Sequence, residues 1–147
     1  MTKQDKDYSI SLEFKPDPKE AAFVFENLSR DAEIEAGLKK EYCKFGLFVR
    51  DNEGTIIGGL IAEIAWNWLY IVYIWIHEDI RGRGIGTRLL EEAENEAKRR
   101  GCRSAFLETF SFQARPLYEQ LGYEVYGVLD DMPPGYKRFY MKKSLDI

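Results

Sequence analysis

The feature that most constrains this chain is a glycine-rich loop between a predicted strand and the longest predicted helix. The loop, residues 81–87, has the sequence Arg-Gly-Arg-Gly-Ile-Gly-Thr, with three alternating glycines. Apolar residues fill 69–76 before it, and an apolar repeat of four residues runs from Gly84 to Arg100 after it. Alternating glycines allow a tight bend, and a helix N-terminus directs several N–H groups to one point. The loop therefore predicts an anion-binding site.

Two well-known phosphate-binding loops do not fit these residues. A Walker loop needs lysine followed by serine or threonine after its glycines, and no lysine lies between Lys44 and Lys98. The dinucleotide fingerprint needs a third glycine where this chain has Thr87, and it belongs to repeated strand–helix–strand units. The residues therefore argue against a nucleotide-dependent enzyme of either kind.

The rest of the pattern predicts an α+β protein built around one mixed sheet. Three strands between residues 45 and 76 have only short links, so we expect an antiparallel meander. Helical charge pairs at Glu94/Lys98 and Glu96/Arg100 are expected on the solvent side. The predicted strands are 10–14, 45–50, 55–65, 69–76, 104–109, 123–129 and 139–145; the predicted helices are 19–30, 31–40 (N-cap Asp31), 84–100 and 114–121.

Length and composition favour one soluble domain. The 147 residues match a prior of about 150 residues per domain, so we expect one domain over 1–147 with its core at 8–145. The net charge of −4 argues against nucleic acid as a partner. One histidine and two cysteines cannot form a zinc site, so no metal is expected. The polar start and the short apolar run at 66–76 predict a cytoplasmic protein without a membrane span.

Two motifs resemble those of the GNAT superfamily of N-acetyltransferases. Arg81-x-x-Gly84-x-Gly86 matches a loop that begins with Arg or Gln, continues x-x-Gly-x-(Gly or Ala), and binds the pyrophosphate of acetyl-CoA in that family. Residues 112–123 are similar to a second signature, commonly N-x-x-A-x-x-(F or L)-Y-x-x-L-G-F. The stretch 108–114 is similar to a bacterial subgroup of small GNAT proteins.

The resemblance implies a GNAT-type fold, with one central, mostly antiparallel sheet of about seven strands and helices on both faces. It implies an acyltransferase that moves the acetyl group of acetyl-CoA directly to a primary amine of a small molecule. Backbone N–H groups of the loop would hold the pyrophosphate, and the strand before it would pair with the pantetheine arm. The cofactor-binding residues expected from the resemblance are Trp75, Ile76, Arg81, Gly82, Arg83, Gly84, Ile85, Gly86, Thr87, Gln113 and Tyr118.

Catalytic roles follow from the same resemblance. Tyr118 occupies the family position of the acid that protonates the departing thiolate, although an aromatic residue there could also simply pack in the core. Gln113 could hydrogen-bond the cofactor arm or cap the helix. A general base is needed to accept the proton of the amine. The candidates are Glu108, which we favour, Glu63 and His77.

The acceptor is indicated only by charge. Residues 51–80 contain five acidic residues and neither lysine nor arginine, which would attract a cationic amine or simply form a solvated surface. Dimers are common among relatives, so a homodimer is expected by resemblance, with the sheet edge after residue 136 as one candidate contact. A CoA-binding sensor or interaction module without catalysis is the alternative function.

Overall fold

The computed structural model describes residues 7–145, and the chain divides into two compact units, residues 1–38 and 39–147. The first unit contains helix α1, Pro18–Ala36. The side chain of Asp17 accepts a hydrogen bond from the Lys19 N–H, and Gly37 ends the helix in a left-handed conformation. None of the helix residues is buried.

Two predictions for this first unit are wrong. The two helices expected at 19–30 and 31–40 are one helix, in which Asp31 is an internal residue rather than an N-cap. No glycine or proline interrupts residues 19–36, so nothing in the sequence stops the helix before Gly37. The strand expected at 10–14 is not formed, because alternating polarity makes a strand only where a neighbouring strand accepts its hydrogen bonds.

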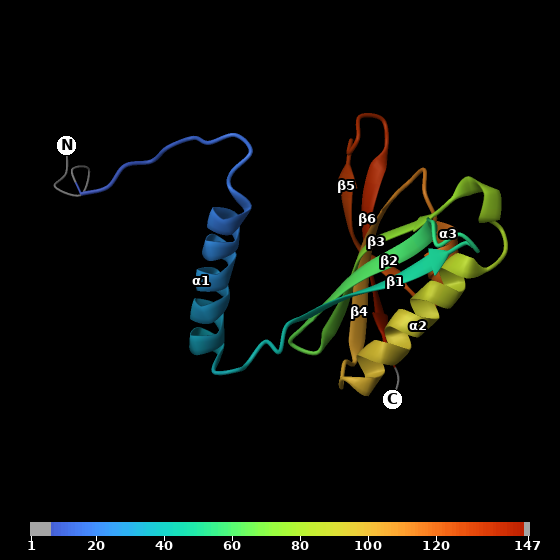
Figure 1. Ribbon diagram of the computed structural model, residues 1–147, viewed down its shortest axis with the longest axis horizontal. Helices are drawn as coiled ribbons and strands as arrows, with labels where there is room; N and C mark the ends of the chain where they lie inside the picture. The colour runs from blue at the N-terminus through green and yellow to red at the C-terminus, as the bar shows by residue number, and fades with distance from the viewer. Residues whose placement is uncertain (1–6, 146–147) are drawn as a thin grey trace. The chain divides into compact units, whose positions relative to one another are not determined.

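The second unit is built on one mixed sheet (Figure 1). Within residues 39–145 the sheet has six strands, one fewer than expected because the strand at 10–14 is absent. The strand order is β1-β2-β3-β4-β6-β5, and only the β3–β4 pair is parallel. The elements are β1 (Cys43–Arg50), β2 (Ile56–Ala65), β3 (Trp68–Ile76), the short 3-10 helix η2 (Glu78–Ile80), α2 (Ile85–Arg99), β4 (Ser104–Phe110), α3 (Arg115–Gln120), β5 (Glu124–Asp130) and β6 (Lys137–Ser144).

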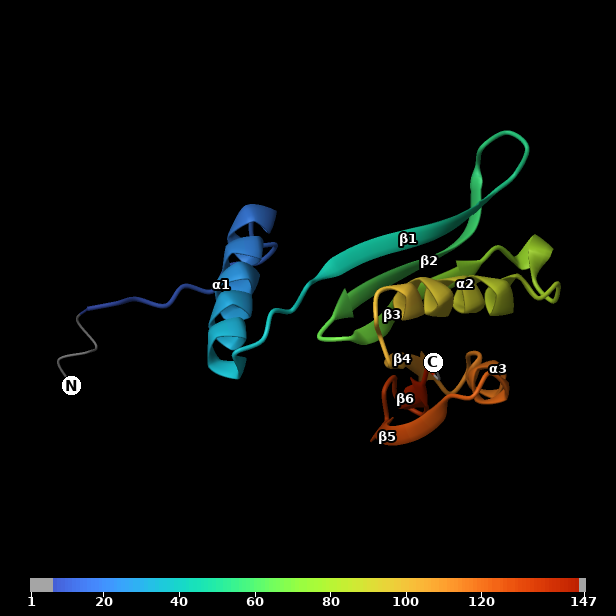
Figure 2. The same ribbon diagram turned by 90° about the horizontal axis from the view of Figure 1, so that it is seen from below.

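Helices α2 and α3 share one core with the sheet (Figure 2). The predicted apolar stripe of α2 is confirmed, because Leu89, Ala93 and Ala97 are buried and Ile85 packs against the core. This face of α2 lies on strands β2 and β3. The alternate residues of the strands complete the core, as the burial of Leu60, Leu69, Leu107 and Met141 shows. None of the helices in residues 7–145 is long and apolar enough to cross a membrane.

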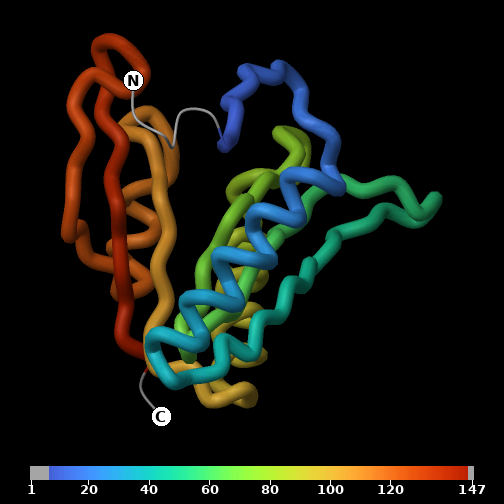
Figure 3. The backbone as a smooth tube through the Cα atoms, turned by 90° about the vertical axis from the view of Figure 1, so that its left-hand side faces the viewer, coloured from blue at the N-terminus to red at the C-terminus, as the bar shows by residue number. Residues whose placement is uncertain are grey.

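Strands β3 and β4 run together at one end and separate at the other (Figure 3). Their pairing extends from Trp68–Ser104 to Ile71–Leu107 and stops there. The register between β2 and β3 shifts at the same level, between Ile61 and Ala62, so β3 carries a bulge where it leaves β4. A bulge bends and twists a strand, which accounts for the separation.

Candidate functional site

The glycine loop ends in a helix N-terminus that fits an anion. Gly82 and Gly84 have φ angles of 77° and 76°, a left-handed conformation that favours glycine. Gly84 is the N-cap of α2, and no side chain caps the helix. A Cβ atom built on either glycine would meet no atom within 4 Å, so the space in front of the loop is open. The first turn of α2 contains no acidic residue, and its N–H groups and dipole suit a phosphate.

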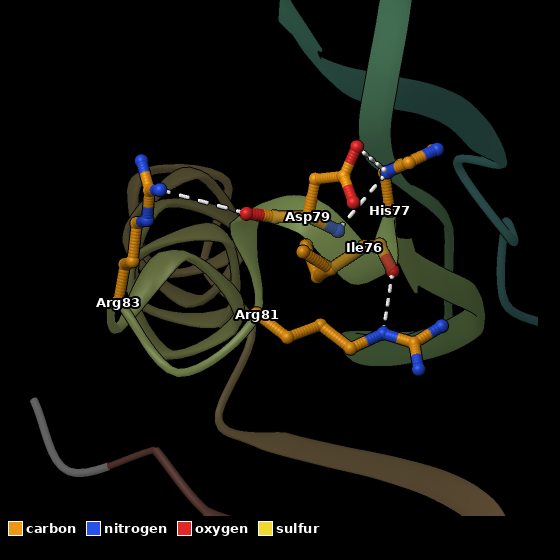
Figure 4. A network of polar contacts seen from close by, with 5 residues as sticks. All are labelled: Ile76, His77, Asp79, Arg81 and Arg83. Atoms are coloured by element: carbon orange, nitrogen blue, oxygen red, sulfur yellow. Dashed lines mark hydrogen bonds and ion pairs between the residues drawn. The ribbon is translucent and has the colours of Figure 1, made fainter.

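The segment that leads into the loop is held by its own polar contacts (Figure 4). Arg81 Nε donates a hydrogen bond to the carbonyl oxygen of Ile76 at 2.9 Å, which ties the loop to the end of β3. His77 Nδ1 accepts from the Asp79 N–H at 3.1 Å and caps η2. Arg83 donates to the Asp79 carbonyl oxygen at 3.5 Å. His77, a candidate base, therefore has a structural contact as the cap of this turn.

The expected pantetheine-binding strand lies where β3 and β4 have separated. Trp75 and Ile76 pair with Gly59 and Gly58 of β2, whereas β4 has no pairing with them. One edge of β3 therefore faces the space between the strands, ahead of the glycine loop. An extended thioester arm can pair with such an edge, so the residues present fit acetyl-CoA.

Tyr118 is the buried phenol of helix α3. Only 5% of its surface is exposed, and burial raises the pKa of its hydroxyl above the usual value of 10. The hydroxyl therefore stays protonated at neutral pH, as a general acid must be before it donates. Leu117, the preceding residue, lies 3.9 Å from a Cβ built on Gly86 of α2. The start of α3 is thus close to the glycine loop.

Gln113 is used in the turn between β4 and α3. Its side-chain oxygen accepts hydrogen bonds from the Phe110 N–H at 3.1 Å and from the Thr109 hydroxyl at 3.5 Å. The oxygen therefore closes the turn that precedes α3 and leaves only the amide NH2 group for a ligand.

The two acidic candidates gather around one tyrosine on the sheet face opposite α2. Glu63 of β2 is the register partner of Tyr70 in β3. On the other edge of β3, Tyr70 pairs with Phe106 of β4, and Glu108 lies two residues further along β4 on the same face of the sheet. The rings of Tyr70 and Phe106 are stacked 4.6 Å apart. Burial, and then the nearby Glu108 carboxylate, raise the pKa of the Tyr70 hydroxyl. The sheet therefore brings both carboxylates to the level where β3 and β4 separate.

The two carboxylates differ in their partners. Glu108 forms an ion pair with Arg138 of β6 and lies close enough to the Tyr70 hydroxyl to raise its pKa. Glu63 interacts with the hydroxyl of Tyr42, a neutral donor. Arg138 was not among the predicted site residues. The sequence around Arg138 gives little indication of this role, because only the pairing of β4 with β6 places Arg138 beside Glu108.

The prediction for Glu94 was wrong. It was expected on the solvent side of α2 with Lys98, yet its side chain is buried and bonded to Tyr123 and Lys143. Position 94 follows the apolar Ala93 and lies within the buried stripe. The expected pair of Glu96 with Arg100 is confirmed, at 2.9 Å.

A cavity of about 420 Å³ lies between α2 and strand β1, and its lining includes none of these residues. Glu96 on its rim is ion-paired with both Arg99 and Arg100. The cavity contains none of the predicted site residues; its lining is Phe45, Leu47, Glu92, Asn95, Glu96, Arg99 and Arg100.

Comparisons with known proteins agree with this arrangement. Residues 8–123 match the model of the acetyltransferase (GNAT) family. A blasticidin-S acetyltransferase of Streptomyces morookaense is 32% identical over 69% of this chain and 75% of its own length. An acetyltransferase of Agrobacterium fabrum is 34% identical over 65% of this chain and 69% of its own length.

Among solved structures, an acetyltransferase from Bacillus cereus has a TM-score of 0.77 at 30% identity. The match covers 91% of this chain and 97% of the other. The glycine-loop motif and the separated strands thus lie within a matched family region that spans most of the sequence. The chain belongs to the GNAT family of acetyltransferases and is an acyltransferase.

Proposed function

We propose that this enzyme transfers the acetyl group of acetyl-CoA to a primary amine of a small molecule. The observation that carries the proposal is the separation of β3 from β4 directly before an open glycine loop. The separation leaves one strand edge for the pantetheine arm, and the loop offers N–H groups for the pyrophosphate. Arg81 and Arg83 add positive charge beside the loop.

In the proposed reaction the amine nitrogen attacks the thioester carbonyl carbon, and the carbon–sulfur bond then breaks. The carbonyl oxygen gains negative charge during the attack, and a backbone N–H near the bulge of β3 would stabilise it. Tyr118 donates its hydroxyl proton to the departing thiolate and regains a proton from solvent. Its buried, protonated phenol supports this role.

Glu63 is the proposed general base, acting directly or through a water molecule. A proton placed on Glu108 would break its ion pair with Arg138. Glu63 forms no ion pair within residues 7–145 and interacts with the neutral hydroxyl of Tyr42. We therefore assign Glu108, the residue favoured from the sequence, to holding Tyr70 and Arg138 in place beside the acceptor. The base and the acid lie on opposite sides of the sheet, so the amine can lose its proton on one side while the departing thiolate gains one on the other.

The proposed acceptor is a cationic small molecule. The acidic residues of 51–80 would attract it, and one named relative acts on an antibiotic, blasticidin S.

The proposal includes a homodimer. Light scattering of the purified protein measures the molar mass in solution, and a mass of one chain would contradict the dimer.

The test is release of CoA thiol from acetyl-CoA by the full chain, with blasticidin S, spermidine, an aminoglycoside and a lysine-containing peptide as separate acceptors. We expect turnover with one of them, and a loss of about 100-fold in kcat for Tyr118→Phe with unchanged affinity for acetyl-CoA. Turnover that is equal in the wild-type protein and Tyr118→Phe would contradict the role of Tyr118. Tight binding of acetyl-CoA without turnover on any amine would favour the catalytically silent sensor.

A further inference from the structure

A carboxylate is buried beneath the helix that carries Tyr118. Glu94 of α2 has a side chain that is 8% exposed. Its Oε2 accepts a hydrogen bond from the hydroxyl of Tyr123 at 2.9 Å, and its Oε1 accepts from Lys143 Nζ at 2.7 Å. The three residues come from α2, the turn after α3, and β6. The contact therefore joins three elements that are far apart in the sequence.

Tyr123 connects this contact to Tyr118. The two rings meet edge to face, with centroids 6.1 Å apart, and the Tyr123 N–H donates to the Tyr118 carbonyl oxygen at 2.9 Å. Tyr123 is 3% exposed, and burial together with Glu94 raises the pKa of its hydroxyl. Its hydroxyl therefore remains a donor to Glu94 across the whole neutral range. Tyr123 stands where the signature commonly has phenylalanine, which lacks this hydroxyl.

Helix α3 needs such support because it is short. It has six residues and no side-chain N-cap, and a helix of that length is not stable by its own hydrogen bonds. Lys143 also packs against the turn that follows α3, where its Cε atom lies 3.5 Å from a Cβ built on Gly122. The ammonium group of Lys143 lies 5.5 Å from the centre of the Tyr123 ring. The Glu94 contact thus fixes the C-terminal end of α3 from two sides.

A buried charge is costly, and an apolar side chain of similar volume would fill the same space more cheaply. An apolar residue would not fix the direction of the Tyr123 ring, whereas the charge-assisted hydrogen bond from its hydroxyl to Glu94 does. The direction of that ring sets the face against which Tyr118 packs. We therefore infer that the Glu94 carboxylate serves to orient the Tyr123 ring and not merely to fill space in the core.

We propose that Glu94 and Tyr123 are positioning residues that hold the Tyr118 hydroxyl on the sulfur of CoA. Glu94 fixes Tyr123, and Tyr123 fixes Tyr118; neither touches the substrate. The inference rests on the proposed role of Tyr118 as the acid. Loss of the contact would leave the donor site intact and move the hydroxyl away from the thiolate, because small displacements of a reacting group have large effects.

The test compares the binding of CoA and desulfo-CoA, which lacks the sulfur, and needs no acceptor. Calorimetric titrations near pH 9, where part of the thiol is ionised, give the ratio of the two affinities. A hydrogen bond from Tyr118 to the thiolate should make wild-type protein prefer CoA by about tenfold. The variants are Tyr118→Phe, Tyr123→Phe and the double variant, with Tyr136→Phe as a matched control for an exposed tyrosine.

We expect Tyr118→Phe to abolish the preference for CoA and Tyr123→Phe to reduce it severalfold. The double variant should equal Tyr118→Phe alone, because Tyr123 acts through Tyr118. Desulfo-CoA affinity should stay constant throughout, which a general loss of structure would not allow. If Tyr123→Phe folds poorly, two variants of Glu94 replace it. Glu94→Gln keeps a hydrogen-bond acceptor for Tyr123 and should retain the preference for CoA over desulfo-CoA, whereas Glu94→Leu should lose it.

The two proposals fail in different ways. A full preference for CoA in Tyr123→Phe and Glu94→Leu would overturn the positioning role and leave the acid role of Tyr118 intact. A wild-type protein that binds both ligands equally would overturn the acid role, and the positioning role with it. A wild-type protein that binds neither ligand would overturn the proposed function itself.

Discussion

The two halves of β3 have similar sequences and different surroundings. The first half, Trp68–Ile71, pairs with β2 on one side and β4 on the other, and its Leu69 and Ile71 are buried. The second half, from Tyr73 to Ile76, pairs only with β2, and Tyr73 is 70% exposed. The first half holds the sheet together, whereas the second offers a strand edge to a ligand.

The difference between the two halves arises from a single irregularity in β3. The register shift between Ile61 and Ala62 lies at the level where β3 and β4 separate. Glu63, Tyr70 and Glu108 gather at the same level. One local irregularity therefore sets both the separation of the strands and the position of the carboxylates.

The paired half should carry the stability. Leu107 of β4 is 1% exposed beside Ile71, and Leu107→Ala should lower the free energy of unfolding by about 2–5 kcal/mol. Tyr73→Ala in the separated half removes an exposed ring and should cost less than about 0.5 kcal/mol. Urea denaturation measures both values. Equal losses would show that the second half is packed as tightly as the first.

The level at which the strands separate should carry the chemistry. Glu63→Gln should lower kcat by about 100-fold, because the proposed base can no longer accept a proton. Glu108→Gln should mainly raise the KM of the acceptor, because it disturbs Arg138 and Tyr70 instead. Steady-state kinetics with the acceptor found in the thiol assay separates the two. A larger loss of kcat in Glu108→Gln would return the base to Glu108.

The loop beyond the second half should carry donor affinity. Gly84→Ala should weaken acetyl-CoA binding by about tenfold, because a side chain in the left-handed conformation strains the N-cap and occupies the space before the N–H groups. Gly54→Ala, with a φ of 85° in the β1–β2 turn, introduces the same strain and should leave binding unchanged. Calorimetric titration compares the two variants. Equal weakening would mean that strain alone, and not the anion site, affects affinity.

The smallest expected effect is on alkaline stability. The pKa values of Tyr118 and Tyr123 are raised in the folded protein, so their contribution to stability is complete below about pH 10 and falls as the pH rises above it. Tyr123→Phe should make this alkaline decrease shallower. Thermal melting between pH 8 and pH 11 measures it, and an unchanged slope would contradict the burial of the Tyr123 hydroxyl.

Local patterns predicted the elements that depend on local physics. The four-residue repeat of Ile85, Leu89, Ala93 and Ala97 correctly predicted helix α2 and its buried face. Residues at this spacing lie on one side of a helix, and that side packs against the core. The glycines of residues 82–86 gave the loop, because a left-handed turn before a helix needs them. The prediction of two helices within residues 19–40 was wrong, because Asp31 is an internal residue of α1 and Gly37 ends the helix.

Features that depend on distant contacts could not be predicted. The strand at 10–14 required a partner strand that its own alternation does not supply. Glu94 was placed in solvent, because a glutamate four residues before a lysine is usually exposed, and its true partners lie 29 and 49 residues away. Arg138 became part of the site only through the pairing of β4 with β6.

The most direct test of the central claim is thermal melting of the purified protein with acetyl-CoA, CoA, ATP and NAD added separately. A ligand that binds only the native state at 100 times its Kd adds about 2.7 kcal/mol of stability. We expect acetyl-CoA and CoA to raise the Tm by roughly 5 °C or more, and ATP and NAD to leave it unchanged. No shift with either CoA species, or a shift with NAD instead, would contradict the assignment of the glycine loop and the separated strands to acetyl-CoA.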